Sequence, residues 1–237
     1  MRTIAVIARK GGSGKSTVAV HLALAAHLRG MSVMLADTDA QRSASQVLRN
    51  RSQSSPRVVG TTGAKLFQLQ LQAQREGVDV LVVDTPAVLE EDLGHAIVTA
   101  NLCLLVLRPT YLDLAATAQT SDIVRRLRKP LIGVLNQAAS PRAGIEPPLV
   151  KRSLQALGLL RIPTAPAILR ARAGYQWAIE TGRSVEEVDG QREAAAEISA
   201  LWTFVYGLTR QRNERSPEAI EAVGRRLNRA NAPCRSG

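Results

Sequence analysis

Near its start the chain reads Thr3-Ile-Ala-Val-Ile-Ala-Arg-Lys10-Gly-Gly-Ser-Gly-Lys-Ser-Thr17, an apolar run followed by a glycine-rich loop. The run at residues 3–8 predicts a buried strand, and residues 17–29, apolar on most faces, predict a helix packed on a sheet. A loop between a strand and a helix offers backbone N–H groups and the positive end of the helix to an anion, and a lysine neutralises phosphate charge. The sequence therefore predicts a phosphate-binding loop.

The rest of the chain alternates between short apolar runs and longer helical patterns, which is typical of strands joined by crossover helices. We expect further strands at residues 32–36, 57–59, 78–83, 102–107 and 131–135, and a short last strand or edge at 161–163. Helices are expected at residues 42–51 (exposed and polar), 64–75, 112–127, 149–157, 171–181 and 192–210. The predicted fold class is α/β, a doubly wound and mostly parallel sheet flanked by helices, as in P-loop nucleoside triphosphatases. We interpret residues 1–210 as one domain and residues 211–237 as a polar tail with a weak helix at 217–229.

The composition restricts the classes of partner. Hydrophobic residues make up 45% of the chain and aromatic residues only 3%, which suits helices on a buried sheet. The net charge of +11 favours polyanions, either nucleic acid or an acidic membrane face, although a solubilising surface has the same composition. Two cysteines without a metal-binding spacing argue against disulfide and thiolate–metal chemistry. No apolar run reaches the roughly 18 residues of a spanning helix, so we expect a cytoplasmic protein.

The loop departs from the common phosphate-binding motif G-x-x-x-x-G-K-[ST], because Arg9 stands where that motif has its first glycine. It matches instead the variant K-G-G-x-G-K-[ST], and here the sequence resembles the ParA/MinD family of deviant Walker ATPases. The resemblance implies that Lys15 acts within its own subunit and that Lys10 reaches the nucleotide of a partner subunit, both as catalytic residues. It also implies that the loop binds ATP or ADP through a set of small residues and Lys15: Gly11, Gly12, Ser13, Gly14, Lys15, Ser16 and Thr17.

Acidic residues end two of the predicted strands. The segment Asp37-Thr-Asp39-Ala-Gln41 is similar to the D-x-D-P-Q element of the family, with Ala40 in place of proline. By that resemblance Asp39 orients the attacking water and Asp37 lies near the metal. Asp84 resembles the Walker B carboxylate, which holds Mg²⁺ through water, while Ser16 supplies a hydroxyl ligand. An acid that follows a strand is also a common helix cap, but several such acids beside a phosphate loop favour a Mg²⁺–ATP site.

Further positions are carried over from the resemblance, which covers roughly residues 2–207. Asn136 resembles the base-contacting asparagine of the family, and Pro163 lies in a segment resembling the one that walls the adenine, although asparagine after a strand is also ordinary turn chemistry. The length resembles the short ParA type, without an N-terminal helix-turn-helix domain. In that type basic residues of both subunits bind DNA nonspecifically, and the candidates are Lys151, Arg152, Arg170 and Arg172. The alternative for each of these four is a solvated basic surface.

Together these features predict a nucleotide switch. The ATP-bound homodimer would hold nonspecific DNA at the nucleoid, hydrolyse ATP slowly, and be stimulated by a ParB-like or cargo-adaptor protein. It would segregate plasmid or chromosomal DNA, or position a protein cargo. One alternative is a MinD-like membrane-associated regulator, but a tail with only Ile220, Val223 and Leu227 makes a poor anchor, so a membrane partner is not expected. Another is a metabolic ATP-dependent synthetase on the same fold.

Overall fold

The computed structural model describes residues 1–52, 56–87 and 90–211 and contains one six-stranded sheet within them. The strands are β1 (Arg2–Ile7), β2 (Val33–Asp37), β3 (Arg57–Gly60), β4 (Val80–Asp84), β5 (Leu102–Leu107) and β6 (Leu131–Leu135). The helices are α1 (Lys15–His27), α2 (Ser43–Arg49), α3 (Leu66–Arg75), α4 (Glu90–Thr99), α5 (Tyr111–Arg126), α6 (Pro148–Leu159), α7 (Ala173–Glu180) and α8 (Arg192–Gln211), with 3₁₀ turns η1 (Gly63–Lys65) and η2 (Val185–Glu187). Every strand pair is parallel, in the order β3-β2-β4-β1-β5-β6.

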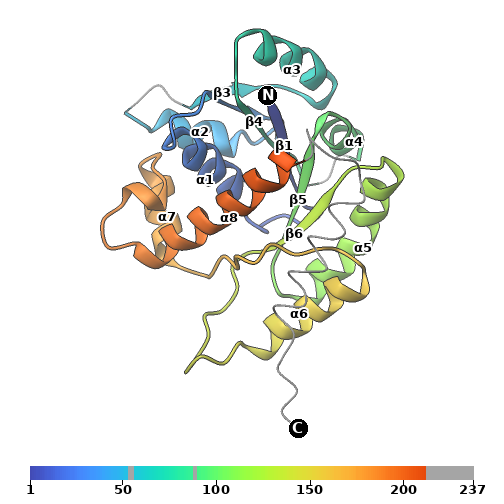
Figure 1. Cartoon of the computed structure of the whole chain (residues 1–237), viewed down its shortest axis with the longest axis vertical. Coiled ribbons are helices and arrows are strands. Elements are labelled where there is room, and N and C mark those ends of the chain that lie inside the picture. The colour runs from blue at the N-terminus through green and yellow to red at the C-terminus, as the bar shows by residue number, and fades with distance from the viewer. Residues whose placement is uncertain (53–55, 88–89, 212–237) are drawn as a thin grey trace.

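Helices cover both faces of this sheet because successive side chains of a strand point to opposite faces. In β1, Ile4 and Val6 pack into a core with α1, α2, α7 and α8. Ala5 and Ile7 pack into a second core with α3, α4, α5 and α6. Both cores are apolar, so the strands read as continuous apolar runs, as parallel sheets require. Figure 1 shows these two layers of helices on either side of the strands.

The strand order indicates which end of the sheet can bind a ligand. From β1 the chain moves outward to β2 and β3, returns to β4 beside β1, and then crosses to β5 and β6. In open α/β sheets a ligand binds where the order reverses, outside the carboxyl ends of the strands. The loop after β1, Asp37 of β2 and Asp84 of β4 all lie at that end, and Asp37 and Asp84 are paired in the register of β2 and β4.

The predicted doubly wound α/β fold is confirmed, with differences in three elements. Helix α4 was not predicted, although Leu93, Ala96, Ile97 and Ala100 repeat at helical spacing and are buried. Helix α2 is not simply exposed, because Ala44, Ser45 and Leu48 are buried. The segment at 161–163 is the edge alternative: Pro163 accepts a hydrogen bond from the Gly133 amide of β6 at 2.8 Å, and no strand forms there.

The predicted tail helix at 217–229, with its apolar set, lies outside the described residues, and the division at residue 210 stays a prediction. Within the described part of the chain, no helix combines the length and the apolar character that crossing a membrane would require.

Candidate functional site

The glycine-rich loop joins β1 to α1 and depends on two glycines with positive φ. Gly12 has φ 73° and Gly14 has φ 88°, a region that favours glycine. A Cβ on Gly14 would also lie 2.2 Å from Nδ2 of Asn136, so a side chain does not fit there. Gly11 has open space around its Cβ position. The backbone at Gly14 therefore lies close to the Asn136 side chain, directly before α1 begins.

Two amides at the end of β6 hold the loop from one side. Asn136 donates from Nδ2 to the Ser13 carbonyl at 2.8 Å, and Gln137 donates from Nε2 to the Gly12 carbonyl at 3.0 Å. Asn136 is 5% exposed, so its bond is protected from water. These bonds satisfy the Ser13 and Gly12 carbonyls, so the loop N–H groups are the part of the loop that can meet an anion. Sequence reasoning missed Gln137, and its position next to Asn136 at a strand end was the available signal.

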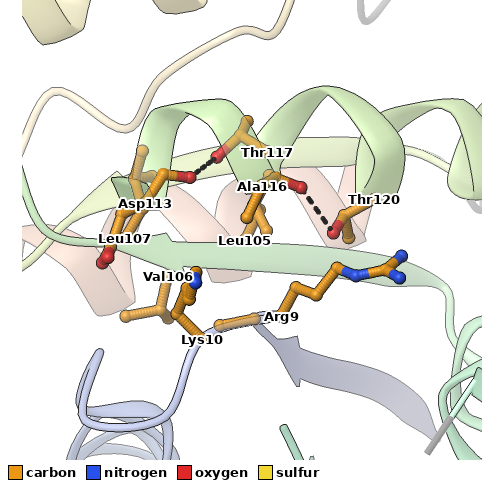
Figure 2. A pocket seen from close by; sticks show the side chains of 10 residues that line it. Arg9, Lys10, Leu105, Val106, Leu107, Asp113, Ala116, Thr117 and Thr120 are labelled. Atoms are coloured by element: carbon orange, nitrogen blue, oxygen red, sulfur yellow. Dashed lines mark hydrogen bonds between the residues drawn. The ribbon is translucent and has the colours of Figure 1, made fainter. Parts of the chain in front are cut away.

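The two lysines of the loop lie in different environments. Lys15 is 7% exposed, and burial lowers its pKa while the nearby Asp84 and Asp39 carboxylates raise it. Lys10 is exposed at the start of the loop. Figure 2 shows Lys10 beside Val106 of β5, below the helix α5 that carries Asp113. The space between these residues is only about 10 Å³, which is room for about one water.

The acids at the ends of β2 and β4 have unequal numbers of partners. Asp37 accepts two hydrogen bonds on Oδ2, from the amide (2.8 Å) and hydroxyl (2.7 Å) of Ser45, and one on Oδ1 from the Asp39 amide (3.2 Å). Its carboxylate thus joins β2 to α2. Asp39 is half-buried and accepts from the Gln41 amide at 2.9 Å. Asp39 therefore keeps more of its carboxylate open to solvent than Asp37 does.

Asp84 has the environment expected of a metal-linked carboxylate. The residue is fully buried, and among the described residues neither carboxylate oxygen has a hydrogen-bond partner of ordinary geometry. Burial raises the pKa of Asp84 to about 7; the Ser16 hydroxyl and Lys15 lower it, and Asp37 and Asp39 raise it further. Two unsatisfied oxygens beside a hydroxyl suit Mg²⁺, which uses few protein ligands together with water and phosphate. Within the described chain no cluster of three or more His, Cys, Asp or Glu side chains forms a metal cage.

A hollow of about 410 Å³ opens beside the loop, on the side of β6. It is lined by Thr17, Asn136, Gln137, Arg170, Ala171, Arg172, Ala173, Tyr175 and Gln176. It adjoins Thr17 at the start of α1 and Asn136 at the end of β6. Pro163 does not line it, because Pro163 contacts Gly133 near the middle of β6.

The four candidate DNA-binding residues fall into two pairs. Lys151 and Arg152 are exposed on α6. Arg170 forms an ion pair with Glu146, and Arg172 forms ion pairs with Glu193 and Glu197, the latter at 2.8 Å. The arginine pair thus has local counter-charges beside the hollow, whereas the α6 pair faces solvent. Separations of 21 to 25 residues put these glutamates beyond any local sequence pattern.

A glycine-rich loop at the carboxyl edge of a parallel sheet, a buried lysine and a buried strand-end aspartate define the chain as a P-loop nucleotide-binding protein. Residues 4–231 match the CobQ/CobB/MinD/ParA nucleotide-binding domain. The chain belongs to this family and is a ParA/MinD-type ATPase, as the loop motif predicted.

Its relatives include proteins of several cellular roles. The chain is 33% identical over 200 residues to "Maintenance of carboxysome distribution protein A" of Gloeobacter kilaueensis, covering 83% of this chain and 89% of that protein. It is 29% identical over 126 residues to "Protein ParA" of Rhizobium radiobacter, covering 52% and 56%. Among solved structures it resembles Cyanothece McdA in an ATP complex (TM-score 0.73, 14% identity, 87% and 96% covered). It also resembles MinD of Pyrococcus horikoshii with Mg-ADP (TM-score 0.69, 18% identity, 88% and 98% covered). At these identities the structures support the fold alone.

Proposed function

We propose that this chain is an ATP-dependent dimerising switch that binds DNA nonspecifically in its ATP-bound form and releases it after slow hydrolysis. The observation that carries the proposal is the contrast between the two loop lysines. Lys15 is buried against its own Asp84 and Asp39, whereas Lys10 is exposed at the loop surface. A buried lysine serves the nucleotide of its own subunit, and an exposed one is free to reach the nucleotide of another subunit.

The residues divide the chemistry of phosphoryl transfer among them. The loop amides and Lys15 hold the phosphates, and the half-exposed Asp39 orients a water toward the terminal phosphate. Asp84 and Ser16 would hold Mg²⁺, which when bound offsets charge on the phosphate oxygens. Asp37 keeps Asp39 in place through its bond to the Asp39 amide. Asn136 and the adjoining hollow receive the base, while the role of Pro163 near adenine stays a prediction.

The partners we propose are a second copy of this chain, DNA, and a stimulating adaptor protein of the ParB-like or cargo-linked kind. Lys151 and Arg152 are the first candidates for DNA contact because both are exposed on α6 and form no ion pair with a described residue, while Arg170 and Arg172 would first have to leave their glutamates. The relative named for carboxysome distribution supports a protein cargo, and the relative named ParA supports DNA segregation. Either cargo is compatible with the proposed switching cycle.

The decisive experiment measures ATP-dependent retention on nonspecific DNA for Lys10→Ala and Lys15→Ala. Lys15→Ala is expected to lose both ATP binding and DNA retention. Lys10→Ala is expected to bind ATP as a monomer and still lose retention, because the dimer that gathers the basic residues does not form. Lys65→Ala, an exposed lysine on η1, is the matched control and should behave as wild type. Unchanged retention in both loop variants would overturn the proposal.

A further inference from the structure

Arg108 follows β5 and places its guanidinium against the phosphate loop. Its Nη1 lies 3.7 Å from the position that a Cβ would take on Gly12, and no other atom lies within 4 Å of that position. Asn136 and Gln137 hold the loop through its carbonyls, as described above. Arg108 thus adds a cationic side chain next to Gly12, the loop glycine at φ 73°.

Asp113, in the first turn of α5, fixes the orientation of this guanidinium. Oδ2 accepts from Nε and from the backbone amide of Arg108, and Oδ1 accepts from Nη2, each at 3.0 Å. This paired geometry is the most specific that arginine and a carboxylate form. Asp113 is itself held, since its amide donates to the Thr110 hydroxyl at 3.3 Å.

The Asp113 carboxylate that holds the guanidinium is buried and stays charged. The Asp113 side chain is 2% exposed. Burial alone would raise the pKa of Asp113, but the hydrogen bonds from Arg108 outweigh it and lower the pKa below its usual value. The carboxylate is therefore ionised at neutral pH and holds the guanidinium in one orientation. Binding of an anion to Arg108 would then cost little additional side-chain entropy.

The end of Arg108 that faces the loop is unused. Among the residues that the structure describes, none accepts a hydrogen bond from Nη1, while Nε and Nη2 are engaged by Asp113. The side chain is 33% exposed, so water and solutes reach it. A guanidinium with two donors fixed and one end free at a phosphate loop is prepared to bind an anion.

We propose that Arg108 is a phosphate-contacting residue whose Nη1 donates to the polyphosphate of a nucleotide bound at this loop, with Asp113 as its positioning residue. The inference rests on the proposed function, because it needs a nucleotide at the loop. The polyphosphate belongs either to the same subunit or to the second subunit of a dimer. Arg108 would join Lys15 and Lys10 as a third cation, one that is held by paired hydrogen bonds from Nε and Nη2 to a buried carboxylate.

The test measures binding of a non-hydrolysable ATP analogue with Mg²⁺ by calorimetry, and dimer formation by sedimentation, for Arg108→Gln, Arg108→Lys and Asp113→Asn. In dilute, monomeric protein Arg108→Gln should weaken analogue binding about tenfold, the usual effect of losing one charge-assisted hydrogen bond. If monomer affinity is unchanged but dimerisation falls about tenfold, the contact is to the other subunit's nucleotide. Arg57→Gln, which breaks an exposed ion pair with Glu76, is the control.

The Asp113→Asn variant distinguishes a contact between Arg108 and phosphate from a purely structural role of the Arg108–Asp113 pair in supporting the loop. Both Arg108→Gln and Asp113→Asn break the Arg108–Asp113 pair, but only the former removes the cation. A contact predicts a clearly larger loss in Arg108→Gln, with partial recovery in Arg108→Lys. Equal losses in all three variants, or no loss in any, would overturn the inference, and thermal denaturation shows whether each variant is folded. If wild-type protein failed to bind the analogue, the proposed function itself would be wrong, which is a different result.

Discussion

At the scale of single residues, Gly14 and Gly11 differ in what surrounds them although both belong to one loop. Gly14→Ala places a methyl group 2.2 Å from Nδ2 of Asn136 on a backbone with φ 88°, so the Asn136–Ser13 bond must break or the loop must shift. We expect loss of nucleotide binding and a fall in unfolding free energy of about 1–3 kcal/mol. Equilibrium unfolding in urea and calorimetry measure the two effects.

Gly11→Ala is the matched control, since nothing lies within 4 Å of its Cβ position. It should change stability by less than about 0.5 kcal/mol, as surface substitutions usually do. Equal losses of unfolding free energy in the two alanine variants would contradict the loop geometry.

His21 predicts a pH dependence of stability. The side chain is fully buried on α1, its Nδ1 lies 2.8 Å from the Thr17 carbonyl, and its ring packs edge-on against Tyr175. Burial lowers the pKa of His21 to about 4, against an ordinary 6.5, so the unfolded chain binds more protons than the folded one between these values. Stability from this group is complete above pH 6.5 and is lost as pH falls toward 4, by about 3 kcal/mol in all.

The measurement is unfolding free energy in urea at several pH values for wild type and His21→Leu. Carboxylates titrate alike in both proteins, so the difference between the two curves isolates His21. We expect that difference to change steadily between pH 6.5 and pH 4 and to be flat above pH 7. A difference independent of pH would show that His21 is not buried in its neutral form.

The sequence predicted some of the site residues but not the contacts that their side chains make. The glycines, both lysines and the strand-end acids could be located from spacing, because a phosphate loop fixes the order of its parts. The partners of Arg170, Arg172 and Arg108 could not be located, because the positions of Glu146 and Glu197 and the orientation of Asp113 depend on how the elements pack together. A charged residue in the sequence does not reveal whether its charge is available.

At the scale of elements, the hydroxyl of Ser45 is one of the groups that attach α2 to β2. Ser45 of α2 donates to Oδ2 of Asp37 from both its amide and its Oγ, and the residue is 3% exposed. Ser45→Ala leaves the buried carboxylate with one donor fewer, so we expect unfolding free energy to fall by about 1.5–3 kcal/mol. Ser43→Ala, on the same helix and only half-buried, is the control and should cost less than half as much. Similar midpoints of urea unfolding for both variants would argue against a stabilising bond between the Ser45 hydroxyl and Asp37.

Elements were predicted well where the apolar run was continuous, and poorly where polar residues or glycine interrupted it. The strands were found because parallel strands buried on both faces read as uninterrupted apolar runs. Helix α4 was missed because Glu91 and Asp92 make its first turn polar and Gly94 interrupts its apolar spacing, although Leu93, Ala96 and Ile97 repeat correctly. A glycine inside a helix weakens the local preference, and packing against α3 and η1 supplies what propensity lacks.

At the scale of the whole molecule, the strand order gathers groups that lie far apart in the chain. The loop after β1, Asp84 of β4, Arg108 after β5 and Asn136 after β6 all meet at one edge of the sheet. On this edge the buried lysine and aspartate lie inside while Lys10 lies outside. In the proposed switch, Lys10 at the surface is therefore the charge that a second molecule would use to complete its triphosphate site.

The last prediction concerns the oligomeric state. Sedimentation velocity should show wild type as a monomer with ADP and as a dimer with Mg²⁺ and a non-hydrolysable ATP analogue. Lys10→Ala should remain a monomer with the analogue while binding it, because the exposed ammonium no longer offsets phosphate charge on the other subunit. At four ångströms and an effective dielectric constant of 20 such an attraction is worth about 4 kcal/mol, and two copies act in a symmetric dimer. Raising the salt concentration should weaken the wild-type dimer, since Lys10 of each subunit begins at the surface. Dimers of equal strength in Lys10→Ala and the control Lys65→Ala would show that the loop lysine does not join the subunits.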